Sequence, residues 1–101
     1  MDLKGSKAVI TGASSGIGEA IALQLAARGA CLTLTARRGD RLEELGSRIS
    51  AAGGEAPLLV VADLRQAGDI GRIFEESGER WGGLDILVNN AGLGRKAGFH
   101  D

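Results

Sequence analysis

Short apolar runs alternate with longer amphipathic stretches along most of the chain. Four of these runs are rich in aliphatic and β-branched residues: 7–10 (KAVI), 31–36 (CLTLTA), 57–62 (PLLVVA) and 84–88 (LDILV). Because they are apolar and too short for helices, each is predicted to be a strand. Pro57 stands at the first position of the third run, where a missing N–H group is tolerated.

Three stretches between these runs carry apolar side chains at helical spacing. The apolar stripes are Ile17–Leu25, Leu42–Ile49 and Ile70–Trp81. The first predicts a helix over about residues 17–28, with Gly29 at its C-terminal cap. The third helix is predicted to be weaker, because Gly68, Gly71 and Gly78 each cost about 0.5–1 kcal/mol relative to alanine.

A cap signal precedes the second apolar stripe, and it completes an alternating order of elements. Asp40 is followed three residues later by Glu43, which resembles a capping box, so Asp40 is predicted to cap this helix. The order is then β-α-β-α-β-α-β. Strands separated by helices pair in parallel through right-handed crossovers, and near-continuous apolar strands indicate helices on both faces. The prediction is one α/β domain over residues 1–101, with no internal repeat or linker.

Composition narrows the classes of protein to which the chain can belong. It has 101 residues, of which 44% are hydrophobic and 25% charged, with a net charge of −1. The chain has no excess of basic residues, so neither a nucleic acid nor an anionic membrane is predicted as a partner. The longest aliphatic run, residues 58–62, is too short to span a bilayer, and the N-terminus has no apolar signal core. With its single cysteine, Cys31, the chain is expected to be cytoplasmic.

The stretch TGASSGIG, Thr11 to Gly18, joins the first predicted strand to the first helix. Gly12 allows a tight turn, Gly16 lets a ligand approach the backbone, and Gly18 allows close packing of the helix. N–H groups at the start of the helix attract phosphate, and Ser14 and Ser15 bring hydroxyl groups to the same space. The loop is therefore predicted to bind a pyrophosphate. The alternative is a strand-to-helix turn with a serine cap.

Three motifs together resemble the short-chain dehydrogenase/reductase family. They are TGASSGIG at 11–18, Asp63 after the third strand, and NNAG at 89–92, in the family's order and at suitable separations. The resemblance covers about residues 4–94 and implies a Rossmann-like parallel sheet with strand order 3-2-1-4. It also implies that a dinucleotide cofactor binds to the glycine loop, and that Ile17 is among the loop residues that contact it.

The residues after the second strand favour NADP over NAD. An acidic residue at this place accepts from the ribose 2′-OH of NAD, but here Ala36 is followed by Arg37 and Arg38. Two guanidinium groups can clamp a 2′-phosphate, and no carboxylate is present to repel it. Arg37 is the stronger candidate. Alternatively, the two arginines are a solvated pair at the end of a strand.

The resemblance assigns further cofactor contacts at the ends of the third and fourth strands. Asp63 is expected to accept from the adenine amino group, with the backbone N–H of Leu64 assisting. The alternative for Asp63 is an Asx turn that opens the third helix. Asn90 is expected to contact the adenosine ribose, while the backbone of Ala91 and Gly92 lines the pocket. Asn89 is expected to brace the sheet.

The residues that carry out the family's chemistry have no counterpart in this chain. In the family a tyrosine is the general acid/base for hydride transfer, supported by a lysine and a serine, all beyond the fourth strand. The chain contains no tyrosine, so no catalytic residue is assigned. The expectation is an NADP-binding N-terminal piece of a longer reductase, inactive by itself. An alternative is a non-catalytic nucleotide-binding or interaction module.

The fourth predicted strand is expected to be an edge of the sheet in this chain. Its row of N–H and C=O groups would be open on one side, and apolar atoms of the first and fourth strands would be partly uncovered. Such an edge favours self-association or pairing with a missing C-terminal half. No role is assigned to His100, and no metal site is predicted.

Overall fold

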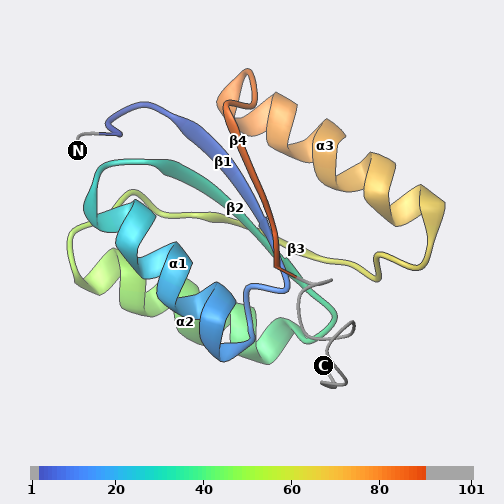
Figure 1. The fold of residues 1–101 in the computed structure, drawn as a ribbon, viewed down its shortest axis with the longest axis horizontal. Coiled ribbons are helices and arrows are strands. Elements are labelled where there is room, and N and C mark those ends of the chain that lie inside the picture. The colour runs from blue at the N-terminus through green and yellow to red at the C-terminus, as the bar shows by residue number, and fades with distance from the viewer. Residues whose placement is uncertain (1–2, 91–101) are drawn as a thin grey trace.

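Strands and helices alternate along the chain, as the sequence predicts. The computed structural model describes residues 3–90. Its elements are β1 (Lys7–Thr11), α1 (Gly16–Ala27), β2 (Cys31–Ala36), α2 (Gly39–Ala51), β3 (Leu58–Val61), α3 (Ala67–Trp81) and β4 (Ile86–Asn89). The strands form one parallel sheet in the order β3-β2-β1-β4, with α1 and α2 on one face and α3 on the other (Figure 1). The predicted fold class and strand order are confirmed.

The direction of winding reverses between β1 and β4. From β1 the chain winds outward to β2 and β3, and it then returns past β1 to place β4 on the other side. The carboxyl ends of β1 and β4 meet in register, with Thr11 opposite Asn89. Open α/β sheets bind ligands where the direction of winding reverses, so the loop after β1 lies at the favoured place.

Each face of the sheet has its own core. On the side of α1 and α2, Ile10, Leu34 and Leu45 are almost fully buried, and Val88 packs against them. On the side of α3, Val9, Val60 and Ile73 form a smaller cluster. A buried hydrogen bond of 2.9 Å from Thr33 Oγ1 to Ser77 Oγ also links β2 to α3. Packing of this face supports α3 despite its glycines, because tertiary contacts override weak helix propensity.

The predicted capping role of Asp40 is wrong. Helix α2 begins at Gly39, its N-cap is Arg38, and no side chain caps it. Asp40 therefore lies inside the first turn, one position past the first helical residue, and not at the N-cap position. Its carboxylate instead complements the positive end of the helix dipole and pairs with Arg38 at 3.1 Å.

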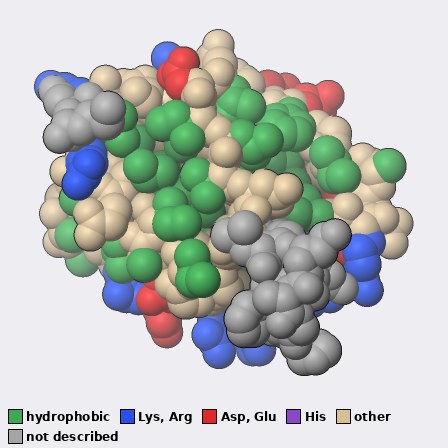
Figure 2. All heavy atoms as spheres, in the orientation of Figure 1, with side chains coloured by type: hydrophobic (Ala, Val, Ile, Leu, Met, Phe, Trp, Pro, Cys, Tyr) green, Lys and Arg blue, Asp and Glu red, His purple; other side chains and the backbone are tan. Residues whose placement is uncertain are grey.

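The expectation of an uncovered edge is correct for β4 and wrong for β1. Within residues 3–90, β4 pairs with β1 only, and Leu87 on β4 is 52% exposed. Leu84 and Phe74 are also exposed. Figure 2 shows hydrophobic side chains gathered across the middle of the face that it draws. Residues of β1 such as Val9 are buried, because β1 has a strand on each side and helices over both faces. No helix in the described part of the chain is long and apolar enough to cross a membrane.

Candidate functional site

The glycine loop makes a tight turn directly after β1. Gly12 has a φ of +66°, a left-handed conformation that side-chain-bearing residues rarely adopt. The next residue is anchored to the neighbouring strand, since the Ala13 amide donates to the Thr35 carbonyl at 3.1 Å. The Ser15 amide then donates back to the Gly12 carbonyl at 3.2 Å. The loop is thereby held against the carboxyl end of the sheet.

Ser15 caps α1, so the serine-cap alternative describes a real feature of the loop. Its hydroxyl accepts from the Gly18 amide at 3.4 Å and donates to the Gly12 carbonyl at 3.0 Å. The amides of Gly16 and Ile17 belong to the first turn, where no intrahelical carbonyl is available. Among the described residues neither amide has another protein acceptor. The cap and a phosphate site are compatible, because these two donors stay available for an anion.

Two glycines of the loop differ in what surrounds them. A Cβ atom on Gly18 would lie 2.4 Å from the Gly12 carbonyl oxygen and 2.7 Å from Asn90 Nδ2. Gly18 is therefore required by close packing between the helix, the loop and the end of β4. A Cβ atom on Gly16 would meet no protein atom within 4 Å. The space beside Gly16 is open, as a ligand site requires.

The two asparagines after β4 have different functions. Asn89 Oδ1 accepts from Thr11 Oγ1 at 3.0 Å, across the pair β1–β4, so its predicted role as a brace of the sheet is confirmed. Asn90 is buried, and its Nδ2 donates to the Gly12 carbonyl at 2.9 Å and to Ser15 Oγ at 2.6 Å. The sequence analysis did not predict these two hydrogen bonds, by which Asn90 supports the glycine loop. The expected ribose contact of Asn90 stays a prediction, and its Oδ1 is the atom left for it.

Replacing Asn90 with alanine should loosen the glycine loop. The substitution removes both hydrogen bonds from the amide and leaves a small cavity next to Gly18, so we expect the free energy of unfolding to fall by about 1–2 kcal/mol. Thermal unfolding followed by circular dichroism measures the loss. Asn89→Ala, which removes a bond from the sheet instead, is the comparison. Unchanged stability of Asn90→Ala would contradict the claim that Asn90 supports the glycine loop.

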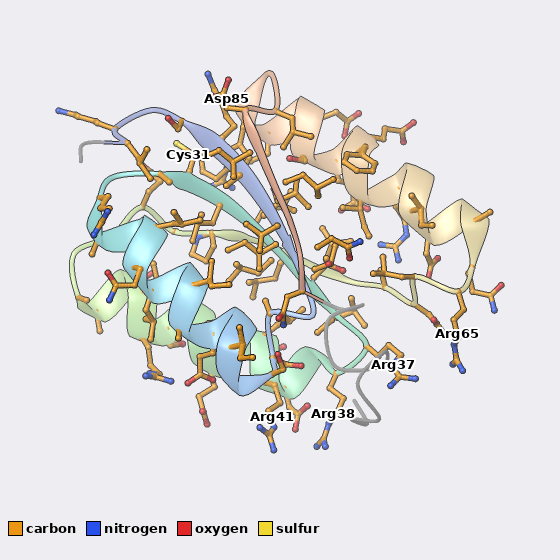
Figure 3. The ribbon with its side chains drawn as sticks, viewed as in Figure 1. Cys31, Arg37, Arg38, Arg41, Arg65 and Asp85 are labelled. Atoms are coloured by element: carbon orange, nitrogen blue, oxygen red, sulfur yellow. The ribbon has the colours of Figure 1, made fainter. Side chains whose placement is uncertain are left out.

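Arginines gather at the carboxyl end of β2. Arg37 and Arg38 follow the strand and are exposed, and Figure 3 shows both with Arg41 at this end of the molecule. Arg38 is partly engaged by Asp40, whose pKa it lowers mainly through their hydrogen bond. Arg37 has no such partner in the described part of the chain, which fits the expectation that it is the stronger 2′-phosphate candidate.

Asp63 lies just after β3 in a tightly bonded turn. The Arg65 amide donates to Asp63 Oδ1 at 2.9 Å, so the Asx turn proposed as an alternative is present. The Arg65 guanidinium also grips the carboxylate, with Nη2 2.8 Å from Oδ2 and Nε 3.1 Å from Oδ1. These bonds from Arg65 lower the pKa of Asp63 to about 2. Leu64 is half-buried against the core under α3.

The low pKa of Asp63 predicts a window of acid sensitivity. The ionised carboxylate is stabilised in the folded protein, so its contribution is present above the ordinary pKa of 3.8 and is lost as pH falls toward about 2. We expect the difference in unfolding free energy between the wild type and Asp63→Asn to shrink across that range. Urea titrations at several pH values measure it. A difference that is constant with pH would show that the pair does not perturb Asp63.

The remaining site candidates, Ser14, Ala91 and Gly92, stay predictions. Ala91 and Gly92 lie outside the described residues. Ser14 is near the start of α1 and half-buried, and its hydroxyl makes no hydrogen bond within residues 3–90. An open depression lined by Arg28 and Cys31 lies at the opposite, amino end of the strands, away from the end at which α/β sheets bind ligands. Within the described range, no cluster of three metal-ligating side chains occurs.

The chain is similar in sequence to known proteins of one family. The family described as short chain dehydrogenase matches residues 6–101. A protein of Sesamum indicum named 11-beta-hydroxysteroid dehydrogenase A is 47% identical over 92 residues. An uncharacterised oxidoreductase of Listeria innocua is 43% identical over 93 residues. The matched region covers 91% of this chain and 26% of the sesame protein, and 92% and 37% for the Listeria protein.

Solved structures agree with the sequence comparison. A glucose dehydrogenase of Caenorhabditis elegans in its apo form has a TM-score of 0.85 at 40% identity, covering 89% of this chain and 39% of that one. A metagenomic short-chain oxidoreductase in complex with NADP has a TM-score of 0.84 at 43% identity, covering 90% and 41%. The chain thus spans well under half of the length of these relatives.

Proposed function

The chain belongs to the short-chain dehydrogenase/reductase family, and from this we propose that it binds NADP as the cofactor-binding portion of an oxidoreductase. The observation that carries the proposal is the pair of first-turn amides, of Gly16 and Ile17, that have no acceptor among residues 3–90 and lie beside the open space at Gly16. Backbone donors at a helix N-terminus, with the helix dipole behind them, suit a pyrophosphate. When bound, the nicotinamide ring supplies the hydride chemistry.

Each part of the site would hold a different part of the cofactor. The loop residues Gly12, Ser14, Ser15, Gly16, Ile17 and Gly18 would surround the pyrophosphate. Arg37, assisted by Arg38, would bind the 2′-phosphate, because each charge-assisted hydrogen bond contributes about 1.5–3 kcal/mol. Asp63 and the amide of Leu64 would bind the adenine. Asn90, Ala91 and Gly92 would line the ribose side of the pocket.

NADP is preferred to NAD in this proposal because the end of β2 lacks a carboxylate. Ala36 is the last residue of β2, and Arg37 follows it. The nearest acidic side chain along α2 is Asp40, which is paired with Arg38 and stabilises the start of the helix. The neighbour of known structure in complex with NADP supports the same choice.

The full reaction of the family requires residues that this chain does not supply. We propose that the complete enzyme moves a hydride between NADP(H) and a carbonyl or alcohol carbon, the class of group that the hydroxysteroid and glucose dehydrogenase relatives are named for. A general acid/base must exchange a proton with the substrate oxygen. The chain contains no tyrosine for that role, so we expect the chain alone to bind cofactor without turnover.

Isothermal titration calorimetry of the protein with NADP and with NAD tests this proposal. We expect saturable binding of NADP and at least about tenfold weaker binding of NAD, the loss expected for one charge-assisted contact. Incubation with NADPH and a panel of ketones should give no oxidation of the cofactor above background. Folded protein that ignores millimolar NADP would overturn the proposed function, and turnover of a ketone would overturn the claim of inactivity.

A further inference from the structure

The Arg65 side chain holds the Asp63 carboxylate through more bonds than the turn itself needs. An Asx turn requires only the bond from the Arg65 amide to Oδ1. Here the guanidinium adds a two-pronged contact, Nε to Oδ1 and Nη2 to Oδ2. Such fork-shaped pairs fix the plane of a carboxylate as well as its charge. The rotation of Asp63 about its last side-chain bond is therefore restricted.

The backbone of Asp63 is also held on both sides. The preceding residue, Ala62, donates to the Ala36 carbonyl at 3.0 Å and continues the pairing of β2 and β3. The Asp63 amide donates to Asp69 Oδ2 at 2.8 Å, from the first turn of α3. With the backbone tied to the sheet and to α3, the fork from Arg65 controls the remaining freedom of the carboxylate.

The bonds leave a single oxygen with room for a ligand. A carboxylate offers about four acceptor positions on its two oxygens. Oδ1 already accepts from the Arg65 amide and from Nε, at 2.9 and 3.1 Å. Oδ2 accepts from Nη2 at 2.8 Å. The single proton of Nε is shared, and its longer arm reaches Oδ2 at 3.3 Å while the shorter arm goes to Oδ1, so Oδ2 accepts only one full bond. Oδ2 is therefore the atom that can take one more donor, and the side chain is only 26% exposed.

We infer that Arg65 is a positioning residue, which holds Asp63 so that its Oδ2 accepts from the adenine amino group of the cofactor. The inference rests on the proposed function. The charge of Arg37, at the end of β2, also acts on Asp63, though less than Arg65 does. Without the fork from Arg65, the carboxylate is free to rotate about its last side-chain bond, and Oδ2 loses its fixed direction. Figure 3 shows Arg37 and Arg65 on the same side of the molecule, at the ends of neighbouring strands.

The test compares NADP with its hypoxanthine analogue, in which an oxygen replaces the adenine amino group. Both carry the same phosphates, so a general loss of positive charge weakens both alike. We expect wild-type protein to bind NADP about tenfold or more tightly than the analogue, because the analogue lacks the donor and sets an oxygen against the carboxylate. In Arg65→Gln this ratio should fall to about twofold, and Arg65→Lys should restore the charge but only part of the ratio.

Arg41→Ala is the matched control, since it removes one exposed charge near the site and leaves Asp63 and Arg65 untouched. It should weaken the binding of NADP and of the analogue equally and keep the ratio of the two affinities unchanged. An unchanged ratio in Arg65→Gln, or full restoration by Arg65→Lys, would overturn the inference, because Arg65 would then act through charge alone. Wild-type protein that binds NADP and the analogue equally would also overturn it, while NADP binding itself stands. If the wild type binds neither, the proposed function fails first.

Discussion

Replacing Arg37 with alanine should weaken NADP binding about tenfold to a hundredfold and leave NAD binding within about twofold. The side chain is exposed at the end of β2 and, among the described residues, is free of the ion pair that engages its neighbour Arg38. A 2′-phosphate is present only in NADP, so the loss should appear in that ligand alone. Calorimetric titration of both cofactors gives the two affinities.

Two further variants separate a specific contact from a general charge effect. Arg38→Ala should reduce NADP affinity less than Arg37→Ala, because Asp40 already holds part of the Arg38 guanidinium at 3.1 Å. Arg41→Ala removes the same charge from the first turn of α2 and should leave the ratio of NADP to NAD affinity near the wild-type value. Equal losses for NADP and NAD in Arg37→Ala would place the 2′-phosphate elsewhere.

Replacing Gly18 with alanine should destabilise the protein by about 3 kcal/mol, at the upper end of the usual range for overpacking. The new methyl group would lie 2.4 Å from the Gly12 carbonyl oxygen, a backbone atom that cannot move without opening the turn. It would also displace the Asn90 amide, 2.7 Å away. Urea unfolding measures the loss of stability, and NADP affinity should fall with it because the loop loses its shape.

Gly16→Ala is the matched control for Gly18→Ala, two residues earlier in the same helix. Its methyl group meets no protein atom within 4 Å, so stability should hold or rise by up to about 1 kcal/mol, since alanine is the better helix former. NADP binding should nevertheless weaken, because the methyl group fills the space assigned to the pyrophosphate. Wild-type affinity in Gly16→Ala would contradict that assignment, and wild-type stability in Gly18→Ala would contradict the packing argument.

The sequence predicted the architecture well because the hydrophobic pattern is strongly periodic. Apolar runs such as residues 31–36 mark buried strands, and the stripes between them mark helices. The glycine spacing also located the loop after β1, since a left-handed turn at Gly12 is a local requirement that glycine meets. The predicted cap at Asp40 was wrong because helix boundaries depend on how the chain leaves the preceding strand, and α2 begins one residue before Asp40.

Several parts of the site depend on contacts between segments far apart in the chain. Asn90 supports the loop at Gly12 and Ser15 because β4 lies beside β1, and local spacing carries no sign of that bond. The grip of Arg65 on Asp63 joins residues only two apart, yet it depends on the direction of the guanidinium, which the pattern of residue types does not specify.

By itself, the sequence determined the alternation of strands and helices, the position of the glycine loop and the absence of an acidic residue after β2, since periodicity and residue type are local properties. Only the tertiary structure decided which polar atoms meet at the carboxyl end of the sheet. The order β3-β2-β1-β4 brings residues 75 or more positions apart within hydrogen-bond distance, as for Asn90 and Ser15. Contacts of that kind arise from packing two faces onto one sheet, and no stretch of the chain contains them alone.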